Sequence, residues 1–397
     1  MIFTLNFGSS SFKYKIFDGT SAVLEGSCEK IGNSSGRAIF RSSKKIVERE
    51  IAFKTHEDAF FNVKKFIFEE STYHNLNLKE NIKAIGHRVV HGGNFFRAPT
   101  LIDSKVIEKI QKLVPLAPIH NEANLNGIRD CFETFGESLP QVAVFDTSFF
   151  VDLPLRACTY AIPEQLSKKY GIRKYGFHGI SHEFANERYC EIKGRNDLNI
   201  ITCHLGSGSS IAAISRGKPI DTSMGFTPLG GLVMGTRSGS LDPSVVTFII
   251  ENENLNANQI NEILNKKSGI LGISGVSSDI RNILEKSKNN QNCRLAIDLF
   301  CYSITKYIGS YIAALGRCDA LIFTAGIGEN HPEIRQKICN NLKSFGIVLN
   351  KKLNLSTKGG KEGFISEPGF GSDIFVVRAD EELSIAMKTE KLLASTK

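Results

Sequence analysis

The sequence contains no Cys-x-x-Cys pair, although nine cysteines are spread over its 397 residues. A structural zinc site or a disulfide framework needs cysteines at recurring spacings, and an odd count leaves one thiol unpaired. Scattered cysteines in a long chain are typical of reduced thiols in the cytosol. We therefore expect neither disulfides nor a cysteine-bound metal ion.

Long apolar runs are missing as well. No stretch approaches the roughly 20 apolar residues that a membrane helix needs. The first residues, "MIFTLNFGSS", have no basic flank and are interrupted at Asn6, so they predict a strand and not a signal peptide. These absences predict a cytoplasmic protein that makes no contact with a membrane.

Blocks of basic residues are also missing, although the net charge is +8, from 49 basic and 41 acidic residues. A positive balance is compatible with nucleic acid or with an anionic small ligand. The lysines are scattered, and no helix-turn-helix, RNP or zinc-finger spacing is present. We therefore expect no nucleic-acid partner.

Three common catalytic signatures are absent too. "SRGKPI" contains the Gly-Lys pair of a P-loop, but Ala212 replaces the first glycine and a proline follows the lysine. "GSGSSI" and "GIGENH" both lack the third glycine of a dinucleotide-binding loop. No Gly-x-Ser-x-Gly elbow of a hydrolase occurs. A nucleotide, if one binds, must bind in another way.

Strand and helix patterns alternate along the whole chain, which predicts an α/β fold. "LNFGSSSFKYKIFDG" and "CHLGSGSSIAAISRG" share a strand, a Gly-Ser turn and a second strand, with Gly8 matching Gly206. We interpret this match as an internal duplication. The chain is expected to form two domains, 1–150 and 151–383, with a terminal helix over 384–397 that packs back on the first domain.

Capping residues predict where the helices begin and end. A long apolar helix over 293–315 is expected to end at Gly316, and residues 325–331 are expected to form a glycine loop after a buried strand. The expected helix starts are Asp103 or Ser104, Ser181, Asp242, Ser277 or Ser278, Pro332 and Asp380.

Three glycine turns follow apolar strands, in "NFGSSS", "HLGSGSS" and "FTAGIGEN". Each alone is most simply a plain turn. A glycine turn after a strand can also point several backbone N–H groups at a phosphate. Three such turns in one chain favour phosphate binding.

Charged side chains and histidines accompany these turns. Arg237 in "TRSG" lies between turn residues, where packing gives no reason for an arginine, so an anion clamp is the better interpretation. Arg88 lies in a strand between two histidines. His178 and His182 have a spacing that suits zinc only within one helix, and Gly179 interrupts it, so we reject metal binding there. Single histidines are otherwise most often ordinary core or surface residues.

Carboxylates form the third set. Asp146 ends a buried strand, where a charge needs a partner or a function. Asp279, Glu381 and Glu382 open helices, and helix capping is the simpler interpretation for each. Phosphate-shaped turns, arginines and carboxylates suited to Mg²⁺ are the parts that phosphoryl transfer needs.

Nine segments in chain order resemble the signatures of the acetate kinase (acetokinase) family: "NFGSSSFKY", "GHRVVHGG", "PLAPIHN", "FDTSF", "YGFHGISH", "HLGSGSS", "GTRSGSLDP", "SSDIR" and "FTAGIGEN". The resemblance implies two duplicated actin-like (ribonuclease H-like) α/β domains with a nucleotide cleft between them, and a homodimer. It implies a kinase that uses ATP/ADP and Mg²⁺, with Mn²⁺ as an alternative, to interconvert acetate and acetyl phosphate.

The resemblance also implies roles for individual residues. Arg88 and Arg237 hold the carboxylate and the phosphoryl group, His178 stabilises the transition state, and Asp146 orients an arginine or the nucleophile. The metal is placed by Asn6 and Glu381. The methyl pocket is expected from Val90, Ile119, Phe177 and Pro228. The nucleotide is expected to contact Ser9, Ser11, Lys13, His204, Leu205, Gly206, Ser207, Gly208, Asp279, Ile280, Arg281, Gly326, Ile327, Gly328, Glu329 and Asn330.

Three residues depart from the family pattern. Ser207 stands where the family usually has asparagine, Ser240 where it has aspartate, and Phe7 where it has a small residue. These changes put nucleotide affinity or preference in question but remove no charged catalytic group.

Other functions stay open at this point. A propionate or butyrate kinase of the same family differs only in the acyl pocket. A sugar kinase would need an aspartate base, for which Asp146 is the candidate. An ATPase that drives binding would not need paired arginines.

Overall fold

The computed structural model describes residues 1–8, 11–42, 45–73 and 78–395. The chain divides into two compact units. Unit 1 comprises Met1–Val151 and Asp380–Lys397, and unit 2 comprises Asp152–Ala379. We expected the first domain to end at residue 150 and the returning helix to begin at residue 384. In the structure, unit 1 ends at Val151 and resumes at Asp380.

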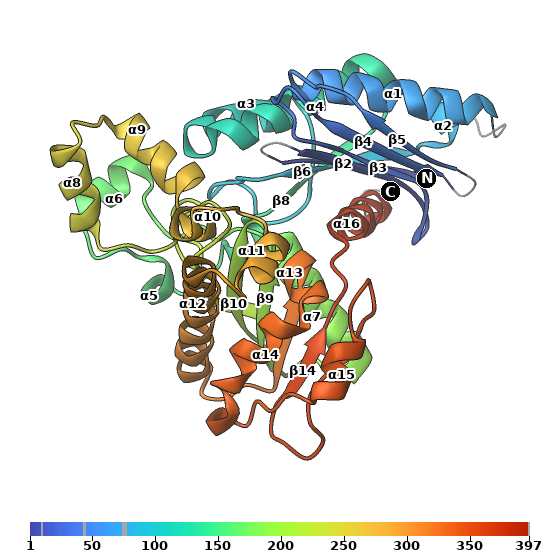
Figure 1. Ribbon diagram of the computed structural model, residues 1–397. Coiled ribbons are helices and arrows are strands. Elements are labelled where there is room, and N and C mark those ends of the chain that lie inside the picture. Colours follow the sequence, from blue (N-terminus) through green and yellow to red (C-terminus); the bar gives the residue numbers. More distant parts are fainter. Residues whose placement is uncertain (9–10, 43–44, 74–77, 396–397) are drawn as a thin grey trace. The chain divides into compact units, whose positions relative to one another are not determined.

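Unit 1 contains one mixed sheet and the helices that cover it (Figure 1). Its strands are β1 (Ile2–Phe7), β2 (Ser11–Asp18), β3 (Ser21–Glu29), β4 (Arg37–Ser42), β5 (Ile46–Glu50), β6 (Ala84–Val89), β7 (Thr100–Leu101) and β8 (Gln141–Phe145). Its helices are α1 (His56–Tyr73), α2 (Leu78–Asn81), α3 (Ser104–Lys112), η1 (Val114–Leu116), α4 (Pro118–Phe135), η2 (Ser148–Phe150) and α16 (Glu381–Ser395).

The strand order of this sheet is β5-β4-β3-β2-β1-β6-β8-β7. β1 is buried along its whole length because α1 and α4 cover one face of the sheet and α16 packs on β1 and β6 from the other (Figure 1). A strand buried on both faces has a continuous apolar run, as the sequence of β1 does. The last helix of the chain therefore completes the core of its first domain.

Unit 2 contains a second mixed sheet. Its strands are β9 (Asn199–Leu205), β10 (Ser209–Ser215), β11 (Lys218–Thr222), β12 (Ala320–Thr324), β13 (Gly363–Phe364) and β14 (Asp373–Val376). Its helices are α5 (Leu155–Cys158), α6 (Glu164–Tyr170), α7 (Gly179–Lys193), α8 (Pro243–Asn252), α9 (Ala257–Glu262), η3 (Ile263–Lys267), α10 (Gly269–Ser274), α11 (Ile280–Lys286), α12 (Gln291–Leu315), α13 (Ala325–Asn330), α14 (Pro332–Asn340), η4 (Lys343–Phe345) and α15 (Lys351–Ser356).

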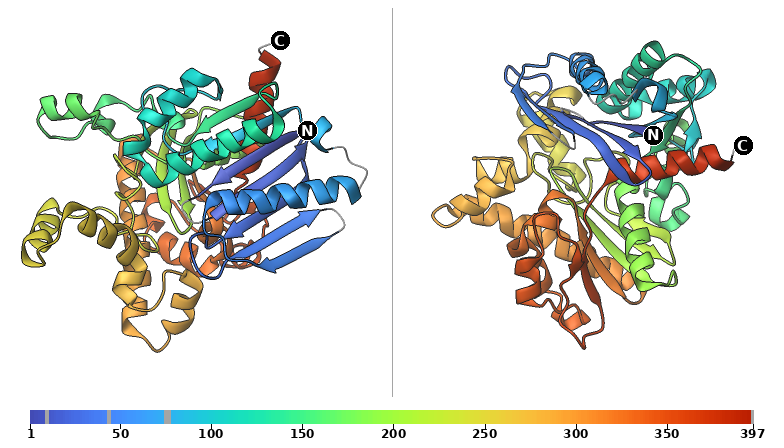
Figure 2. Two further views of the ribbon diagram at one scale, coloured as in Figure 1. Left: turned by 90° about the horizontal axis from the view of Figure 1, so that it is seen from above. Right: turned by 90° about the vertical axis from the view of Figure 1, so that its right-hand side faces the viewer.

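The second sheet repeats the central plan of the first. Its order is β11-β10-β9-β12-β14-β13, in which β9 runs antiparallel to β10 and parallel to β12, and β12 runs parallel to β14. In unit 1, β1 likewise runs antiparallel to β2 and parallel to β6, and β6 runs parallel to β8. α7 and α12 cover opposite faces of the second sheet (Figure 2). The expected fold of two duplicated α/β domains is confirmed.

Several helix boundaries follow the expected capping residues. Asp103 caps α3 through Val106 N, Asp242 caps α8, and Asp380 accepts a bond from Leu383 N at the start of α16. Helix α12 ends at Gly316, which has φ +78°, a left-handed conformation that glycine adopts without strain.

Three local expectations were wrong. α7 begins at Gly179 after His178 and not at Ser181, because His178 itself adopts the left-handed N-cap conformation. α11 is capped by Asp279, whose carboxylate accepts from Arg281 N, and not by Ser277 or Ser278. Residues 325–330 form the short helix α13 in place of a glycine loop.

All nine cysteines are buried free thiols. Within the residues that the structure describes, no helix combines the length and the hydrophobicity needed to cross a bilayer.

Candidate active site

Three strands of unit 1 end in polar side chains. β1 pairs in parallel with β6, and β6 with β8, so their carboxyl ends meet at one edge of the sheet. Open α/β sheets bind ligands at this edge. Asn6 lies near the end of β1, Arg88 near the end of β6, and Asp146 directly after β8. The fold therefore gathers three residues that are far apart in the sequence.

Two of these residues hold the guanidinium of Arg88. Nε and Nη2 donate to Oδ2 of Asp146 over 3.1 and 2.5 Å, and Nη1 donates to Oδ1 of Asn6 over 2.8 Å. The side chain of Asp146 is 1% exposed and that of Arg88 is 13% exposed. Burial alone would lower the pKa of Arg88, but Asp146, Glu381 and Glu382 raise it above its usual value. Arg88 is a fixed cation that solvent can still reach.

The first residues of α16 belong to the same group. Nδ2 of Asn6 donates to Oε2 of Glu381 over 3.2 Å and to Oε1 of Glu382 over 2.8 Å. Glu382 is buried, whereas the side chain of Glu381 is 15% exposed. The sequence analysis assigned only Glu381 to this site, and the structure adds its neighbour.

An ion pair holds α16 in this position. Nζ of Lys15 on β2 donates to both carboxylate oxygens of Asp380 over 2.9 and 2.8 Å, next to the first residue of the helix. Sequence analysis passed over Lys15 because alternation along a strand was its only signal. Lys15 therefore anchors the two glutamates that Asn6 contacts.

The donors of this group suit Mg²⁺. Asn6, Glu381 and Glu382 offer amide and carboxylate oxygens, which are the ligands of a hard cation. Among the described residues, no cluster of three or more His, Cys, Asp or Glu side chains could hold a metal ion. Mg²⁺ is commonly held by one or two carboxylates together with water and substrate phosphates, so the donor set fits.

The N-terminal hairpin supplies the next residues. Gly8 N donates to Ser11 O over 2.8 Å, and Ser11 is half-buried. Lys13 is opposite Asn6 in the β1–β2 register and is exposed. Side chains opposite each other in an antiparallel pair share a face of the sheet. Lys13 is therefore on the face of Asn6, and Ser9 lies outside the described residues.

The residues expected around a methyl group are divided between the units. Val90 is buried in unit 1, where its N–H donates to Oδ1 of Asn124 over 3.1 Å. The side chain of Ile119 lies outside the described residues. In unit 2, Phe177 is buried and Pro228 is half-buried.

The turn between β9 and β10 carries the second glycine motif. Gly206 N donates to Gly208 O over 3.1 Å, and Gly235 N donates to Ser207 O over 3.3 Å. Leu205 is buried, and the side chain of Ser207 is exposed. The turn thus closes on itself and is tied to the loop that leads to Arg237.

Arg237 and His178 meet at this turn. A Cβ atom built on Gly208 would lie 3.2 Å from Cε1 of His178 and 3.3 Å from Nη1 of Arg237. Nη1 of Arg237 donates to Pro228 O over 3.3 Å, and burial lowers the pKa of Arg237. Within the described residues no carboxylate forms an ion pair with it. Arg237 is therefore a half-buried cation without a counter-charge in the described part of the chain.

The third glycine motif is helix α13, directly after β12. Gly326 and Asn330 are exposed, Gly328 is buried, Ile327 is half-buried, and Oε1 of Glu329 accepts from Ala379 N over 2.9 Å. Nδ2 of Asn330 donates to Gly326 O over 3.0 Å.

A buried arginine from α14 fixes the end of α13. Nη1 of Arg335 donates to Gly328 O and Glu329 O, and its other nitrogens bond to Asn354 and Thr357. Arg335 is 0% exposed, and burial lowers its pKa to about 10. Sequence analysis missed it, although Ile338 and Cys339, three and four residues further along the helix, placed it on an apolar face.

Asp279 and Arg281 contact each other. Nη2 of Arg281 donates to Oδ2 of Asp279 over 2.5 Å, and the Arg281 side chain is 76% exposed. Ile280 between them is buried. The helix-capping alternative for Asp279 is thus confirmed, and capping leaves a role in nucleotide binding open.

The sequence as a whole is similar to proteins of one known family. A model of the acetokinase family matches residues 1–387. The chain belongs to the acetokinase family. Acetate kinases from Thermotoga maritima and Carboxydothermus hydrogenoformans are each 45% identical over 400 residues, covering 99% of this chain and 98% and 99% of theirs.

Solved structures agree with this assignment. Acetate kinase from Porphyromonas gingivalis has a TM-score of 0.89 at 42% identity and covers 99% of both chains. A propionate kinase from Francisella tularensis has a TM-score of 0.90 at 40% identity and covers 98% of both chains. Acetokinases are phosphotransferases with a carboxyl group as acceptor, so the chain is a kinase of this class.

Two departures from the acetokinase pattern have local explanations. The ring of Phe7 stacks on Phe12 at 4.2 Å, and Gly127 on α4 leaves it room, since a Cβ there would lie 2.3 Å from Cε2 of Phe7. Oγ of Ser240 accepts from Gly231 N over 3.0 Å and closes the loop that carries Arg237.

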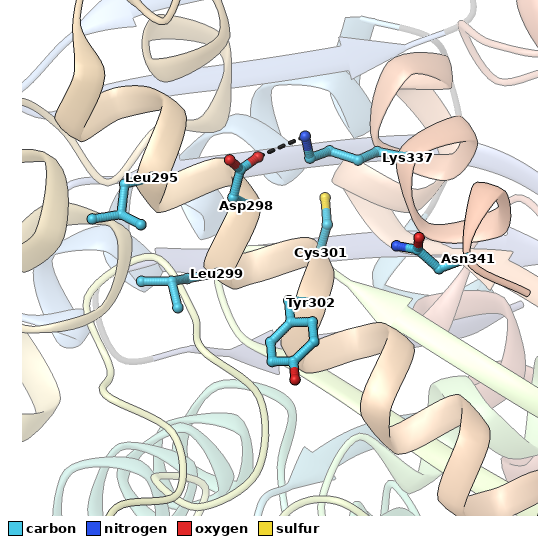
Figure 3. A pocket seen from close by; sticks show the side chains of 7 residues that line it. All are labelled: Leu295, Asp298, Leu299, Cys301, Tyr302, Lys337 and Asn341. Carbon is cyan, nitrogen blue, oxygen red and sulfur yellow. Dashed lines mark ion pairs between the residues drawn. The ribbon is translucent and has the colours of Figure 1, made fainter.

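A pocket of about 350 Å³ opens elsewhere on unit 2 of this acetokinase, between α12 and α14 (Figure 3). Leu295, Leu299 and Tyr302 line one side, and Asp298 pairs with Lys337 across it over 2.6 Å. None of the expected site residues lines this pocket, so it is separate from the candidate active site.

Proposed function

We propose that this protein catalyses the reversible, Mg²⁺-dependent transfer of the γ-phosphoryl group between ATP and acetate, giving acetyl phosphate and ADP by direct in-line displacement. The observation that carries the proposal is the contrast between its two arginines. Arg88 is fixed by Asp146 and Asn6, whereas Arg237 lacks a carboxylate partner among the described residues and is near His178. An unneutralised guanidinium is suited to bind an anion.

The chemistry of the acceptor explains why these residues suffice. A carboxylic acid with a pKa of about 4 is ionised at pH 7, so no general base is required. The difficulty is that the acetate anion must approach an anionic phosphate. Fixed cations that lower this repulsion act by electrostatic preorganisation. A sugar kinase has a hydroxyl acceptor and needs an aspartate base. Asp146 is the candidate for that base, but it pairs with Arg88, which argues against a sugar kinase.

In unit 1, we assign the acyl carboxylate to Arg88 and the orientation of Arg88 to Asp146. Asn6 and Glu381, with Glu382 beside them, would hold Mg²⁺. When bound, Mg²⁺ supplies positive charge to the phosphate oxygens of the nucleotide. Ser9, Ser11 and Lys13 support the phosphate end.

In unit 2, we assign the migrating phosphoryl group to Arg237 and His178. The residues from His204 to Gly208 supply backbone N–H groups to phosphate. The adenosine end is assigned to Asp279, Ile280 and Arg281 and to the five residues Gly326–Asn330 of α13, whose conformation Arg335 fixes.

Propionate is the second candidate acceptor, because the structure of a propionate kinase is as similar to this chain as that of an acetate kinase. Val90, Ile119, Phe177 and Pro228 are assigned to the acyl pocket. One methylene changes discrimination by about 1–3 kcal/mol. We therefore expect acetate to be preferred with a measurable propionate activity, and kcat/KM for acetate, propionate and butyrate decides the order.

The proposal is tested by trapping acyl phosphate with hydroxylamine in the presence of ATP, Mg²⁺ and acetate. We expect hydroxamate only when all three are present, and the loss of product on chelation of Mg²⁺ should be reversed by Mg²⁺ or Mn²⁺. ATP hydrolysis that needs no carboxylic acid would contradict the proposal and favour an ATPase of the same fold.

We also infer a cytoplasmic homodimer, from the family resemblance and the nine buried thiols. Light scattering should give about twice the chain mass of 43.8 kDa. A monomer mass at micromolar concentration would contradict this inference.

A further inference from the structure

Four side chains of unit 2 form a continuous hydrogen-bonded chain that ends at His178. Oγ1 of Thr202 lies 2.7 Å from Nδ1 of His182, Nε2 of His182 lies 2.7 Å from Oγ of Ser210, and that Oγ lies 2.9 Å from Nδ1 of His178. Thr202, His182 and Ser210 are all 0% exposed. These three residues are called the relay below.

The secondary structure explains this alignment. Thr202 is on β9 and Ser210 on β10, and His178 and His182 are one turn apart at the start of α7, which packs on β9. Side chains four residues apart on a helix share a face. Both histidines therefore reach the sheet, with the Ser210 hydroxyl between them.

Each member of the relay carries one proton, so the protons can be counted. Burial lowers the pKa of His182 well below its usual value, and His182 is neutral at pH 7 with one N–H group. A serine or threonine hydroxyl donates one hydrogen bond and can accept others. Within the described residues Oγ of Ser210 bonds only to the two histidines, so its hydroxyl donates to one of them and accepts from the other. The protons therefore all point toward His178 or all point away from it.

In the first arrangement, the Thr202 hydroxyl donates to Nδ1 of His182, Nε2–H of His182 donates to Ser210, and the Ser210 hydroxyl donates to Nδ1 of His178. In this arrangement every donor of the relay has an acceptor. A neutral His178 then carries its own proton on Nε2.

In the reverse arrangement, His178 donates through Nδ1–H to Ser210, Ser210 donates to His182, and His182 donates to Thr202. The Thr202 hydroxyl hydrogen then needs a further acceptor, and within the described residues Oγ1 of Thr202 has no hydrogen-bond partner besides His182. A buried donor without an acceptor costs free energy, because it gives up a hydrogen bond to water and gains none in return. This cost favours the first arrangement.

We propose that Thr202, His182 and Ser210 are positioning residues that hold the proton of His178 on Nε2, which makes this atom a hydrogen-bond donor. A Cβ built on Gly208 would lie 3.3 Å both from Nε2 of His178 and from Nη1 of Arg237. The Nε2–H group is therefore on the side of His178 where Arg237 lies. Its use in phosphoryl transfer rests on the proposed function, whereas the position of the proton does not.

The first test is nitrogen NMR of the ¹⁵N-histidine-labelled full chain without substrates, with the His178 signals assigned from a His178→Asn variant. We expect protonated Nε2 and unprotonated Nδ1. A proton on Nδ1 in the wild-type protein would overturn the proposal without any relay variant having to fold.

The second test compares two buried threonines. Thr202→Val removes the donor that starts the relay. Thr222→Val is the matched control, because Thr222 is 0% exposed on β11 and its hydroxyl donates only to the backbone oxygen of Ile211. We expect Thr202→Val to give a mixture of His178 tautomers and to lower kcat about two- to tenfold, the value of one hydrogen bond. KM for ATP should be unchanged, Thr202→Ser should restore both readouts, and Thr222→Val should affect neither.

A wild-type tautomer pattern and kcat in Thr202→Val would overturn the proposal. Ser210→Ala tests it independently, because it removes the hydroxyl between His182 and His178. If the wild-type protein transfers no phosphoryl group to acetate, the proposed function fails, and the NMR result still decides where the His178 proton is.

Discussion

Arg88 and Asp146 form a buried ion pair in which one carboxylate oxygen accepts two hydrogen bonds from the guanidinium, over 3.1 and 2.5 Å. The pair joins the ends of β6 and β8. Its geometry restrains the plane of the guanidinium, so removal of the carboxylate should affect both the fold and the reaction.

Asp146→Ala is expected to destabilise the protein by about 3 kcal/mol, because it leaves the largely buried guanidinium of Arg88 without its hydrogen-bonded carboxylate, with Glu381 at 4.0 Å as the nearest one remaining. Chemical denaturation of the full chain measures this change. The control is Asp197→Ala, since Asp197 also pairs with Arg195 through two bonds but its side chain is 63% exposed. An exposed pair contributes little to stability because water screens it, and equal losses in both variants would contradict our interpretation.

Arg237→Met should impair the reaction without destabilising the fold, in contrast to Asp146→Ala. Arg237 has no ion-pair partner among the described residues, and its burial opposes its charge, so the melting temperature should be unchanged or higher. Loss of one preorganised cation should lower kcat about 10²–10³-fold. Arg195→Met is the control for removal of an arginine. Near-normal turnover of Arg237→Met would exclude its assigned role.

Gly127→Ala is expected to destabilise unit 1 by about 1–3 kcal/mol, because the new Cβ would lie 2.3 Å from Cε2 of Phe7. Phe7→Leu should relieve the clash, so the double variant should be more stable than Gly127→Ala. A double-mutant cycle measures the coupling. Additive effects would show that the ring of Phe7 can move away without cost.

Lys15→Met removes the ion pair that anchors α16 through Asp380. We expect the Mg²⁺ concentration for half-maximal activity to rise several-fold, because Glu381 and Glu382 lose their support, while KM for ATP changes less. Lys193→Met is the control, since Lys193 forms a comparable pair with Asp373 in unit 2. An unchanged Mg²⁺ requirement would show that the Lys15–Asp380 ion pair does not support the metal site.

Stability should fall as the pH is lowered from about 6.5 to about 4. Burial lowers the pKa of His87 to about 4 in the folded protein, although Gln141 partly opposes the shift. The unfolded chain binds this proton from about pH 6.5, so between these values it holds more protons than the native state. For His87 alone the loss at pH 4 is about 3 kcal/mol.

The measurement is the free energy of unfolding against pH for the wild-type protein and for His87→Gln. The variant should have a shallower slope between pH 4 and 6.5. His331→Gln, which replaces a histidine beside Glu333 at the start of α14, is the control for replacement of a histidine. An equal slope in all three proteins would exclude His87 as the source.

Structural roles that depend on a residue's neighbours in the chain could be predicted from the sequence. The apolar runs of β1 and β8, the cap at Asp103 and the position of Asp146 after a buried strand all follow from local patterns. The repeated strand, Gly-Ser turn and strand indicated the duplication that the common order of the two sheets confirms.

Residues whose role depends on distant partners could not be found in this way. Asn6 and Glu382 are 376 positions apart, so no local pattern connects them. Arg335 is identified only by the carbonyl groups around it, and His182 only by the hydroxyls of Thr202 and Ser210. His178 adopts φ +58°, a conformation that its sequence gives no reason to expect.

Because α16 follows all of unit 2 in the chain but packs on β1 and β6, unit 1 cannot be completed until unit 2 has been synthesised. Every nascent chain that stops before residue 381 lacks both glutamates beside Asn6, whatever else has already folded. Termination before this helix should therefore give inactive protein, and the order of synthesis itself delays catalysis until α16 has been made.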